Sequence, residues 1–180
     1  LIIGATRYEN NKYYNSLINI NSINVSYFDK KILVPFGEFL PLRATLTFLE
    51  SIVGPNNYSK GKSQRIMNIY NDMSFIPVIC YEIVFYWKLL NKFNNKGNFI
   101  VNITNDFWFG DYLGPYQHFY LTKIRAAEFN KPIIRVSNNG ISAVIDNNGA
   151  VLNKTEFNKA ENFTHKLLSL IHISEPTRPY

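Results

Sequence analysis

The sequence predicts an α/β domain in which a β-sheet is covered by helices. Apolar runs of strand length recur along the chain, and most are continuous rather than alternating, which favours strands that are buried on both faces. Stretches with one apolar side at helical spacing lie between these runs. Strands that alternate with helices and then give way to paired strands are typical of this class. The length of 180 residues suits one such domain or part of one.

The expected strands come from the apolar runs. They are residues 1–5, 25–28, 32–34, 75–80, 99–103, 133–136 and 141–145. We expect the first to be a buried strand, and a chain that begins inside a strand without an initiating Met is expected to be cut from something longer. The Asn-Asn-Gly segments at 138–140 and 147–149 tolerate positive φ, so the last strands are expected to pair as hairpins.

Helices are expected at residues 43–53, 83–93 and 116–130. The clearest is the last, in which Tyr120, Ile124 and Ala127 recur at helical spacing. Pro132 ends this helix and precedes the next strand. Residues 55–72 are polar and are expected to form a connection.

Composition and charge exclude several classes of protein. The formal net charge is +6, but the densest basic cluster (Lys60, Lys62 and Arg65) is short and typical of a loop, and no nucleic-acid recognition motif accompanies it. The single cysteine, Cys80, excludes an intrachain disulfide framework and a zinc site built on several cysteines. The sequence contains neither a membrane-spanning run of roughly 18 apolar residues nor a signal-peptide pattern.

The last twelve residues differ from the rest of the chain. The segment SLIHISEPTRPY, residues 169–180, shares no periodicity with what precedes it and resembles the translated read-through of a sequencing adapter. We therefore expect one domain over residues 1–168 and a non-native tail after it.

Cys80 lies where a buried strand ends and a helix begins. A side chain at that position projects from the edge of the sheet, and the backbone N–H of its neighbour points into the same space. The start of a helix favours the reactive thiolate form of a cysteine. Glu82 would complement the positive end of the same helix. The alternative is a buried structural cysteine beside a glutamate that forms a salt bridge.

A second segment, residues 27–41, brings Lys30 and Lys31 into an apolar run and places Glu38 in a rigid Pro-Phe-Gly turn. Burying either charge alone costs several kcal/mol, so a lysine and the glutamate are expected to pair. The alternative is an exposed edge strand whose lysines face water.

These two segments, with four others, resemble a known protein family. Together with NITNDFWFG at 102–110, GPYQH at 114–118, KIRAAE at 123–128 and RVSNNG at 135–140, they resemble the bacterial apolipoprotein N-acyltransferase family over roughly residues 1–155. That family belongs to the carbon–nitrogen hydrolase (nitrilase) superfamily. The resemblance implies a nitrilase-like α-β-β-α sandwich, of which this chain holds part.

The resemblance also implies roles for individual residues. Cys80 matches the nucleophile and Lys30 the catalytic lysine, because the family places its lysine eight residues before the glutamate of the turn. Glu38 then matches a supporting glutamate. Tyr81 and Glu82 match positions that flank the nucleophile and support the oxyanion site.

The family's general-base glutamate lies upstream of the first strand of this chain, as does its transmembrane bundle. Glu9 follows that strand and cannot take the role by motif. The resemblance therefore implies that the 180 residues alone do not turn over substrate.

The activity implied is transfer of an acyl chain from a membrane phospholipid, through a thioester on Cys80, to the N-terminal cysteine of an apolipoprotein. It requires no metal or dissociable cofactor. The implied location is the bacterial inner membrane, with the catalytic domain on the periplasmic side. The alternatives are a soluble amidase or nitrilase of the same superfamily and a binding module without chemistry.

Several other side chains have two interpretations. Five aromatic residues either line an apolar entry for the acyl chain or are part of the hydrophobic core. They are Phe107, Trp108, Phe109, Tyr86 and Trp87. His118 is either a base or a capping or core histidine, and the latter is favoured.

Two sets of polar residues near the predicted helices also have expected roles. Asn105 and Asp106 are expected to end a strand and to bond local backbone. Arg125, Glu128 and Arg135 form either a buried ion-pair network or a solvated helix face.

Overall fold

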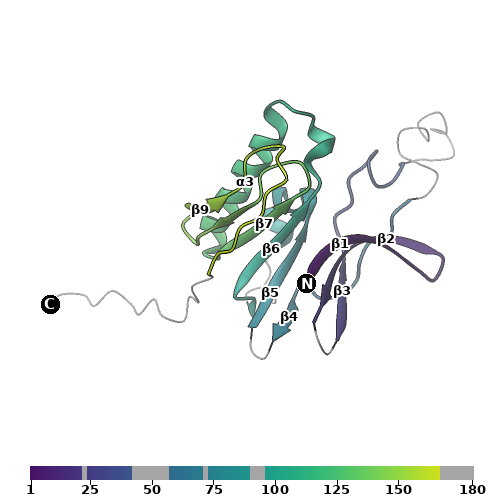
Figure 1. Cartoon of the computed structure of the whole chain (residues 1–180). Coiled ribbons are helices and arrows are strands. Elements are labelled where there is room, and N and C mark those ends of the chain that lie inside the picture. Colours follow the sequence, from purple (N-terminus) through teal and green to yellow (C-terminus); the bar gives the residue numbers. More distant parts are fainter. Residues whose placement is uncertain (22–23, 42–56, 71–72, 90–95, 167–180) are drawn as a thin grey trace.

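The computed structural model describes residues 1–21, 24–41, 57–70, 73–89 and 96–166. They form two sheets that pack against each other (Figure 1). The first sheet is antiparallel throughout, in the order β1 (Ile2–Glu9), β2 (Lys12–Ile20) and β3 (Val25–Asp29).

The second sheet has six strands, and sequence order equals spatial order. They are β4 (Met67–Tyr70), β5 (Met73–Ile79), β6 (Phe99–Thr104), β7 (Ile133–Ser137), β8 (Ala143–Ile145) and β9 (Val151–Lys154). β5, β6 and β7 are parallel and the other neighbours are antiparallel. The carboxyl ends of the three parallel strands therefore meet at one edge, where α/β proteins position their sites.

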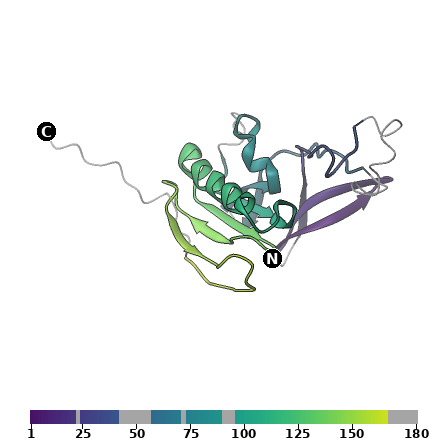
Figure 2. The ribbon, with the colours of Figure 1, turned by 90° about the horizontal axis from the view of Figure 1, so that it is seen from above.

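Two apolar clusters hold these layers together. Between the sheets, Leu17 and Phe28 of the first pack against Phe75, Ile79 and Val101 of the second. The other face of the second sheet packs against α3 (Leu113–Phe129), which runs along it (Figure 2). The described residues thus supply two stacked sheets and one helical layer, which agrees with part of a four-layer sandwich.

The strand predictions for 25–28, 75–80, 99–103, 133–136 and 141–145 are confirmed, with small shifts at the ends. Residues 1–5 form a strand, but the expectation that it is buried is wrong, because Leu1 and Ile3 are 76% and 37% exposed. The polar connection at 55–72 contains β4, which was not expected. β2 was not expected either.

The strand predicted at 32–34 is wrong. These residues are irregular and lead into a turn at 36–38, which is closed by a bridge between Pro35 and Phe39. The amides of Lys31 and Ile32 bond to a side-chain carboxylate rather than to a neighbouring strand.

The helix predicted at 116–130 is confirmed as α3, which begins three residues earlier and ends at Asn130 in a left-handed conformation. The helix predicted at 83–93 is confirmed in part, since α2 (Tyr86–Leu89) lies within it, but it is preceded by a 3₁₀ helix, η2 (Cys80–Val84), and residues 90–93 lie outside the described residues. The helix expected at 43–53 and the tail at 169–180 lie outside the described residues. Within the described part of the chain, no helix is long and apolar enough to cross a membrane.

The hairpins expected near the end of the chain are confirmed, since β8 pairs antiparallel with both β7 and β9. In the second turn Gly149 has φ +85°, and a Cβ there would lie 2.8 Å from the carbonyl oxygen of Lys123. Glycine therefore allows this turn to approach α3.

Candidate active site

Cys80 stands directly after β5 and opens η2, as predicted. Its φ is +52°, in the left-handed region that costs a non-glycine residue about 1–2 kcal/mol. The side chain is half-buried and carries a free thiol. A strained residue at the edge of a sheet persists only when its surroundings hold it, so its contacts matter.

Glu82, two residues after Cys80, is fully buried and accepts hydrogen bonds from three separate segments. One oxygen, Oε2, accepts from the backbone N–H of Ile79 at 3.0 Å and from Arg65 at 2.8 Å. The other, Oε1, accepts from Arg65 at 2.8 Å and from the backbone N–H groups of Lys31 and Ile32 at 2.9 and 3.0 Å. Burial alone would raise the pKa of Glu82, but Arg65 and the backbone bonds from Ile79 and Lys31 together outweigh burial, and the pKa is lowered.

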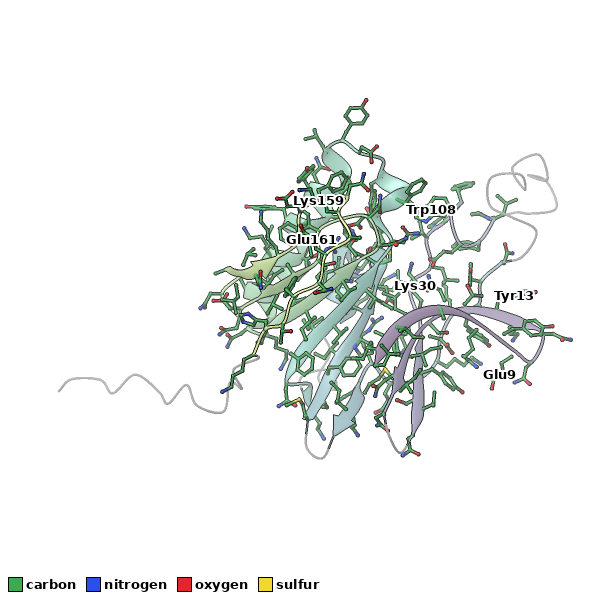
Figure 3. The ribbon with its side chains drawn as sticks, in the orientation of Figure 1. Glu9, Tyr13, Lys30, Trp108, Lys159 and Glu161 are labelled. Carbon is green, nitrogen blue, oxygen red and sulfur yellow. The ribbon has the colours of Figure 1, made fainter. Side chains whose placement is uncertain are left out.

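Lys30 follows β3 and is 1% exposed, between the two sheets (Figure 3). Its Nζ donates to Oε2 of Glu38 at 2.7 Å. Glu38 also accepts from the side-chain amide of Asn15 at 2.8 Å and from the backbone N–H of Val34 at 2.9 Å. The expected pairing of a lysine with this glutamate is confirmed, and an exposed edge strand is excluded.

The structure brings the two predicted segments together through one carboxylate. The backbone bonds of Glu82 reach the residue directly after Lys30, while Glu82 itself stands two residues after Cys80. Glu9, by contrast, lies at the far end of the β1–β2 hairpin and pairs with Arg7 (Figure 3).

The aromatic side chains near Cys80 divide into two groups. Phe107 and Trp108 are 74% and 68% exposed, which excludes the core interpretation for both, and Trp108 points outward (Figure 3). Phe109 is half-buried, and its ring centroid lies 6.1 Å from that of Tyr81 and 5.2 Å from that of His118. Trp87 is also exposed, and the side chain of Tyr86 lies outside the described part.

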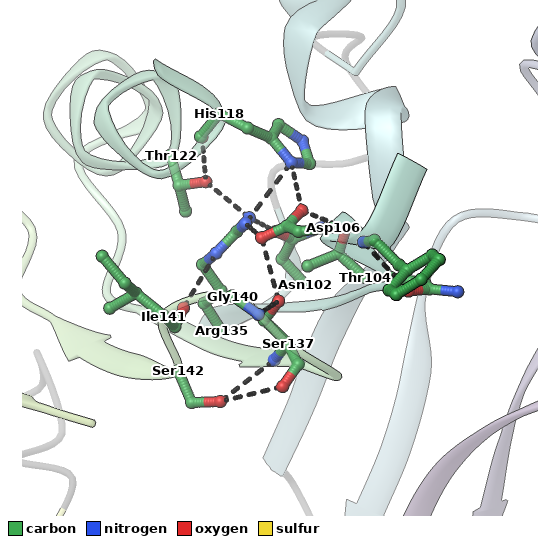
Figure 4. Close-up of polar contacts among 12 residues, drawn as sticks. Asn102, Thr104, Asp106, His118, Thr122, Arg135, Ser137, Gly140, Ile141 and Ser142 are labelled. Carbon is green, nitrogen blue, oxygen red and sulfur yellow. Dashed lines mark hydrogen bonds and ion pairs between the residues drawn. The ribbon is translucent and has the colours of Figure 1, made fainter. Parts of the chain in front are cut away.

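A buried polar network lies at the carboxyl ends of β6 and β7, around Asp106 (Figure 4). Oδ1 of Asp106 bonds Thr104 Oγ1 at 3.1 Å and His118 Nδ1 at 2.8 Å. Oδ2 of Asp106 bonds Arg135 Nη2 at 2.5 Å and Ser137 Oγ at 2.9 Å. Burial alone would raise the pKa of Asp106, but the bond from His118 and the charge of Arg135 lower it to about 2. Asp106 is therefore an ionised anchor of this edge.

The local-capping prediction holds for one of two residues. The Asn105 side chain accepts from the backbone N–H of Phe107 at 3.2 Å, as expected. For Asp106 the prediction is wrong, because its carboxylate bonds side chains from other elements. The positive charge of Arg135 explains this orientation, since a buried guanidinium needs a counter-charge.

His118 is 3% exposed, which favours the core interpretation. Burial lowers its pKa most strongly, the bond to Asp106 opposes this, and Arg135 lowers it further. The neutral ring donates from Nδ1 to ionised Asp106. Nε2 has no hydrogen bond of good geometry, although the Cys80 carbonyl faces the ring. His118 thus belongs to the buried network around Asp106, and its ring centroid lies 6.1 Å from that of Tyr81, the residue after Cys80.

Of the two interpretations of Arg125, Glu128 and Arg135, the solvated helix face is wrong for both arginines, which are buried, and the ion-pair interpretation holds for each arginine with its own carboxylate. Arg125 pairs with Glu128 and donates to the carbonyl of Ile83. Arg135 is separate: it is 1% exposed and donates to Asn102, Thr122 and the carbonyl of Ile141 as well as to Asp106. The two arginines therefore serve different clusters.

Sequence reasoning missed Arg65 and Asn15. Arg65 stood in a basic cluster typical of a solvated loop, yet it is 4% exposed and paired with Glu82. Asn15 lies in β2, which was not expected. Among the described residues, no group of His, Cys, Asp and Glu side chains is arranged to hold a metal ion.

Comparison with known proteins identifies similar sequences. A family model described as carbon-nitrogen hydrolase matches residues 1–168. Proteins named apolipoprotein N-acyltransferase are similar over most of the chain: that of Allorhizobium ampelinum is 39% identical over 93% of this chain and 34% of its own length, and that of Wigglesworthia glossinidia brevipalpis is 37% identical over 86% and 32%. The chain thus spans about a third of the length of these relatives.

Two solved structures are similar to this chain in fold, at lower sequence identity. The glutamine-dependent NAD+ synthetase of Acinetobacter baumannii matches with a TM-score of 0.65 and 18% identity, over 89% of this chain and 30% of that one. Saccharomyces cerevisiae Nit3, a member of branch 10 of the nitrilase superfamily, matches with a TM-score of 0.57 and 16% identity, over 88% of this chain and 55% of that one. These likenesses concern the fold.

Proposed function

The chain belongs to the carbon–nitrogen hydrolase family, and from that premise we propose that the complete gene product is an apolipoprotein N-acyltransferase. It transfers a fatty acyl chain from a membrane phospholipid to the N-terminal S-diacylglyceryl-cysteine of lipoproteins. The support is the similarity to proteins of that name over most of this chain. The proposed location is the inner membrane of a bacterium, with this domain on the periplasmic side.

The observation that carries the proposal is the buried carboxylate of Glu82. It bonds the backbone next to Lys30 and the strand end next to Cys80. A buried carboxylate that ties the backbone beside Lys30 to the backbone beside Cys80 supports the proposal of a preorganised oxyanion site.

In the first half-reaction, Sγ of Cys80 attacks the ester carbonyl of the phospholipid. The negative charge on the tetrahedral oxygen is stabilised by the ammonium of Lys30 and the backbone N–H of Tyr81. A lysine ammonium has three donors, of which one bonds Glu38, so it can follow the moving oxygen. The ester C–O bond then breaks, and the lysophospholipid leaves with the thiol's proton as its hydroxyl. The acyl group remains on Cys80 as a thioester.

In the second half-reaction, the α-amino group of the lipoprotein's cysteine attacks the thioester carbonyl. An amide forms, the C–S bond breaks, and the amine's proton restores the thiol. The two steps give ping-pong kinetics.

Water must be excluded from the thioester until the second half-reaction, because hydrolysis would release the acyl group as fatty acid. Exposed Phe107 and Trp108, continuous with half-buried Phe109 beside Tyr81, supply apolar surface for this purpose and for entry of the acyl chain. These aromatics are the proposed acyl-binding residues.

The test uses the complete gene product with a phospholipid and a diacylglyceryl lipopeptide. We expect N-acylated peptide, lost in Cys80→Ser and reduced at least about 100-fold in Lys30→Gln. A soluble amidase would instead release ammonia from small amides and leave the peptide unmodified. A binding module would keep its function after Cys80→Ser. Either result would overturn the proposal.

A further inference from the structure

Arg65 is a buried cation that the proposed mechanism does not use. It precedes β4 and is 4% exposed, although its neighbours Lys62 and Gln64 are exposed. We propose that Arg65 is a positioning residue of the acyl-transfer site, acting through Glu82 on the backbone that carries Lys30. This inference rests on the proposed function, but part of its test does not.

The contacts of Arg65 fix its guanidinium in one orientation. Nη1 and Nη2 donate to the two oxygens of Glu82, each at 2.8 Å, in the parallel geometry that favours arginine over lysine. Nη1 also donates to the carbonyl of Pro77 in β5 at 2.8 Å. The guanidinium carbon lies 4.9 Å from the ring centroid of Phe28 in β3. Arg65 is therefore held by both sheets.

Glu82 depends on this cation to remain an acceptor on both oxygens. Its five hydrogen-bond donors are the two from Arg65 and the backbone N–H groups of Ile79, Lys31 and Ile32. A protonated carboxyl would place an O–H among these donors and break at least one bond. Without Arg65, burial would favour that protonated form.

The consequence is felt at Lys30. Its backbone N–H donates to the carbonyl of Asn15 at 2.8 Å, and its carbonyl accepts from Gly61 at 2.9 Å. The next two amides, of Lys31 and Ile32, both donate to Glu82. Loss of the Arg65–Glu82 pair therefore frees the backbone on the carboxyl side of Lys30, which the carboxylate of Glu82 otherwise ties to the segment that carries Cys80.

Amide hydrogen exchange tests this positioning in the complete protein, without any substrate. In Arg65→Met, we expect exchange at Lys31 and Ile32 to accelerate by about tenfold or more relative to Ile134 in β7. The control is Lys159→Met, which removes an ion pair with Glu156 that lies outside this cluster. The control should leave Lys31 and Ile32 unchanged. Unchanged exchange at these amides in Arg65→Met would overturn the proposal.

Kinetics test whether the positioning acts through Lys30. Arg65→Met should lower kcat by about tenfold or more with little change in KM, and Arg65→Lys, which keeps the charge, should recover part of the loss. In Lys30→Gln, the added Arg65→Met change should have little further effect. Additive losses would contradict action through Lys30.

A double variant separates positioning from stability. Arg65→Met/Glu82→Leu replaces the buried ion pair with apolar side chains, a change that buried pairs commonly tolerate. We expect it to fold, to show fast exchange at Lys31 and Ile32, and to transfer acyl chains poorly. A folded double variant with wild-type turnover would overturn the proposal. If the wild type acylates no lipopeptide but the exchange result holds, the proposed function fails and the positioning of Lys30 stands.

Discussion

Cys80 combines a chemical role with an unfavourable backbone. At φ +52° a side chain with a Cβ is strained, whereas glycine is not. We expect Cys80→Gly to be more stable than Cys80→Ala by about 1 kcal/mol, measured by urea unfolding. Equal stability of the two variants would mean that the turn does not impose this conformation.

The Asp106–His118 pair predicts how stability depends on pH. The folded chain holds both pKa values below their ordinary values, so the unfolded chain binds more protons at acid pH and stability falls as pH falls. His118 contributes a decline below about pH 6.5, and Asp106 a further loss of about 2 kcal/mol between about pH 4 and pH 2.

Urea unfolding across this pH range checks the assignment. His118→Asn should remove the decline that begins near pH 6.5 and reduce the decline due to Asp106, because the bond from His118 helps to lower the pKa of Asp106. An unaltered profile would assign the upper decline to another group.

At this scale, the sequence predicted the chemistry better than the contacts. The pairing of Lys30 with Glu38 followed from the cost of burying a charge alone. Arg65 could not be predicted, because whether a cation in a polar segment faces water depends on which carboxylate lies across the fold. Asp106 was misassigned for the same reason: its partner Arg135 is distant in sequence.

Among the elements, the turn between β7 and β8 approaches the carboxylate that follows β6. A Cβ on Gly140 would lie 2.1 Å from Oδ2 of Asp106 and 2.5 Å from Oγ of Ser137. Both atoms belong to the buried network, so neither can move without breaking bonds. Glycine is therefore required here for space.

Gly140→Ala should lower the free energy of unfolding by about 2–4 kcal/mol, measured by urea unfolding. The matched control is Gly110→Ala, where φ is +64° and a Cβ would meet nothing within 4 Å, so only backbone strain of about 1–2 kcal/mol is expected. A smaller loss at Gly140 than at Gly110 would contradict the crowding.

Element prediction succeeded where burial on both faces gave continuous apolar runs, as in β5, β6 and β7. It failed for β2, in which Asn15 and Asn19 interrupt the apolar pattern because their side chains bond other segments. It failed for residues 32–34 because an apolar run does not reveal that its amides bond Glu82.

In the molecule as a whole, the candidate lysine comes from the end of the first sheet and the candidate nucleophile from the second. The proposed site requires these two residues to meet, which depends on how the sheets pack, and the sequence does not specify that packing. The resemblance to a known family supplied this arrangement, and Glu82 with Arg65 supplies its physical basis.

The proposed role of the exposed aromatic residues in phospholipid entry leads to a prediction for Trp108. Trp108→Ala should raise KM for phospholipid by about tenfold without lowering the unfolding midpoint, because the side chain is 68% exposed. Tyr8→Ala, which removes an exposed aromatic from the β1–β2 hairpin, is the control and should leave KM unchanged. Unchanged acylation in Trp108→Ala would refute the entry role.

Intact-mass spectrometry of the complete protein after incubation with phospholipid alone tests the central claim most directly. We predict a mass increase of one acyl chain, located on Cys80. Hydroxylamine should remove it, because hydroxylamine cleaves thioesters, and the increase should be absent in Cys80→Ala. An acyl chain on another residue, or acyl transfer to lipopeptide that persists in Cys80→Ala, would contradict the account.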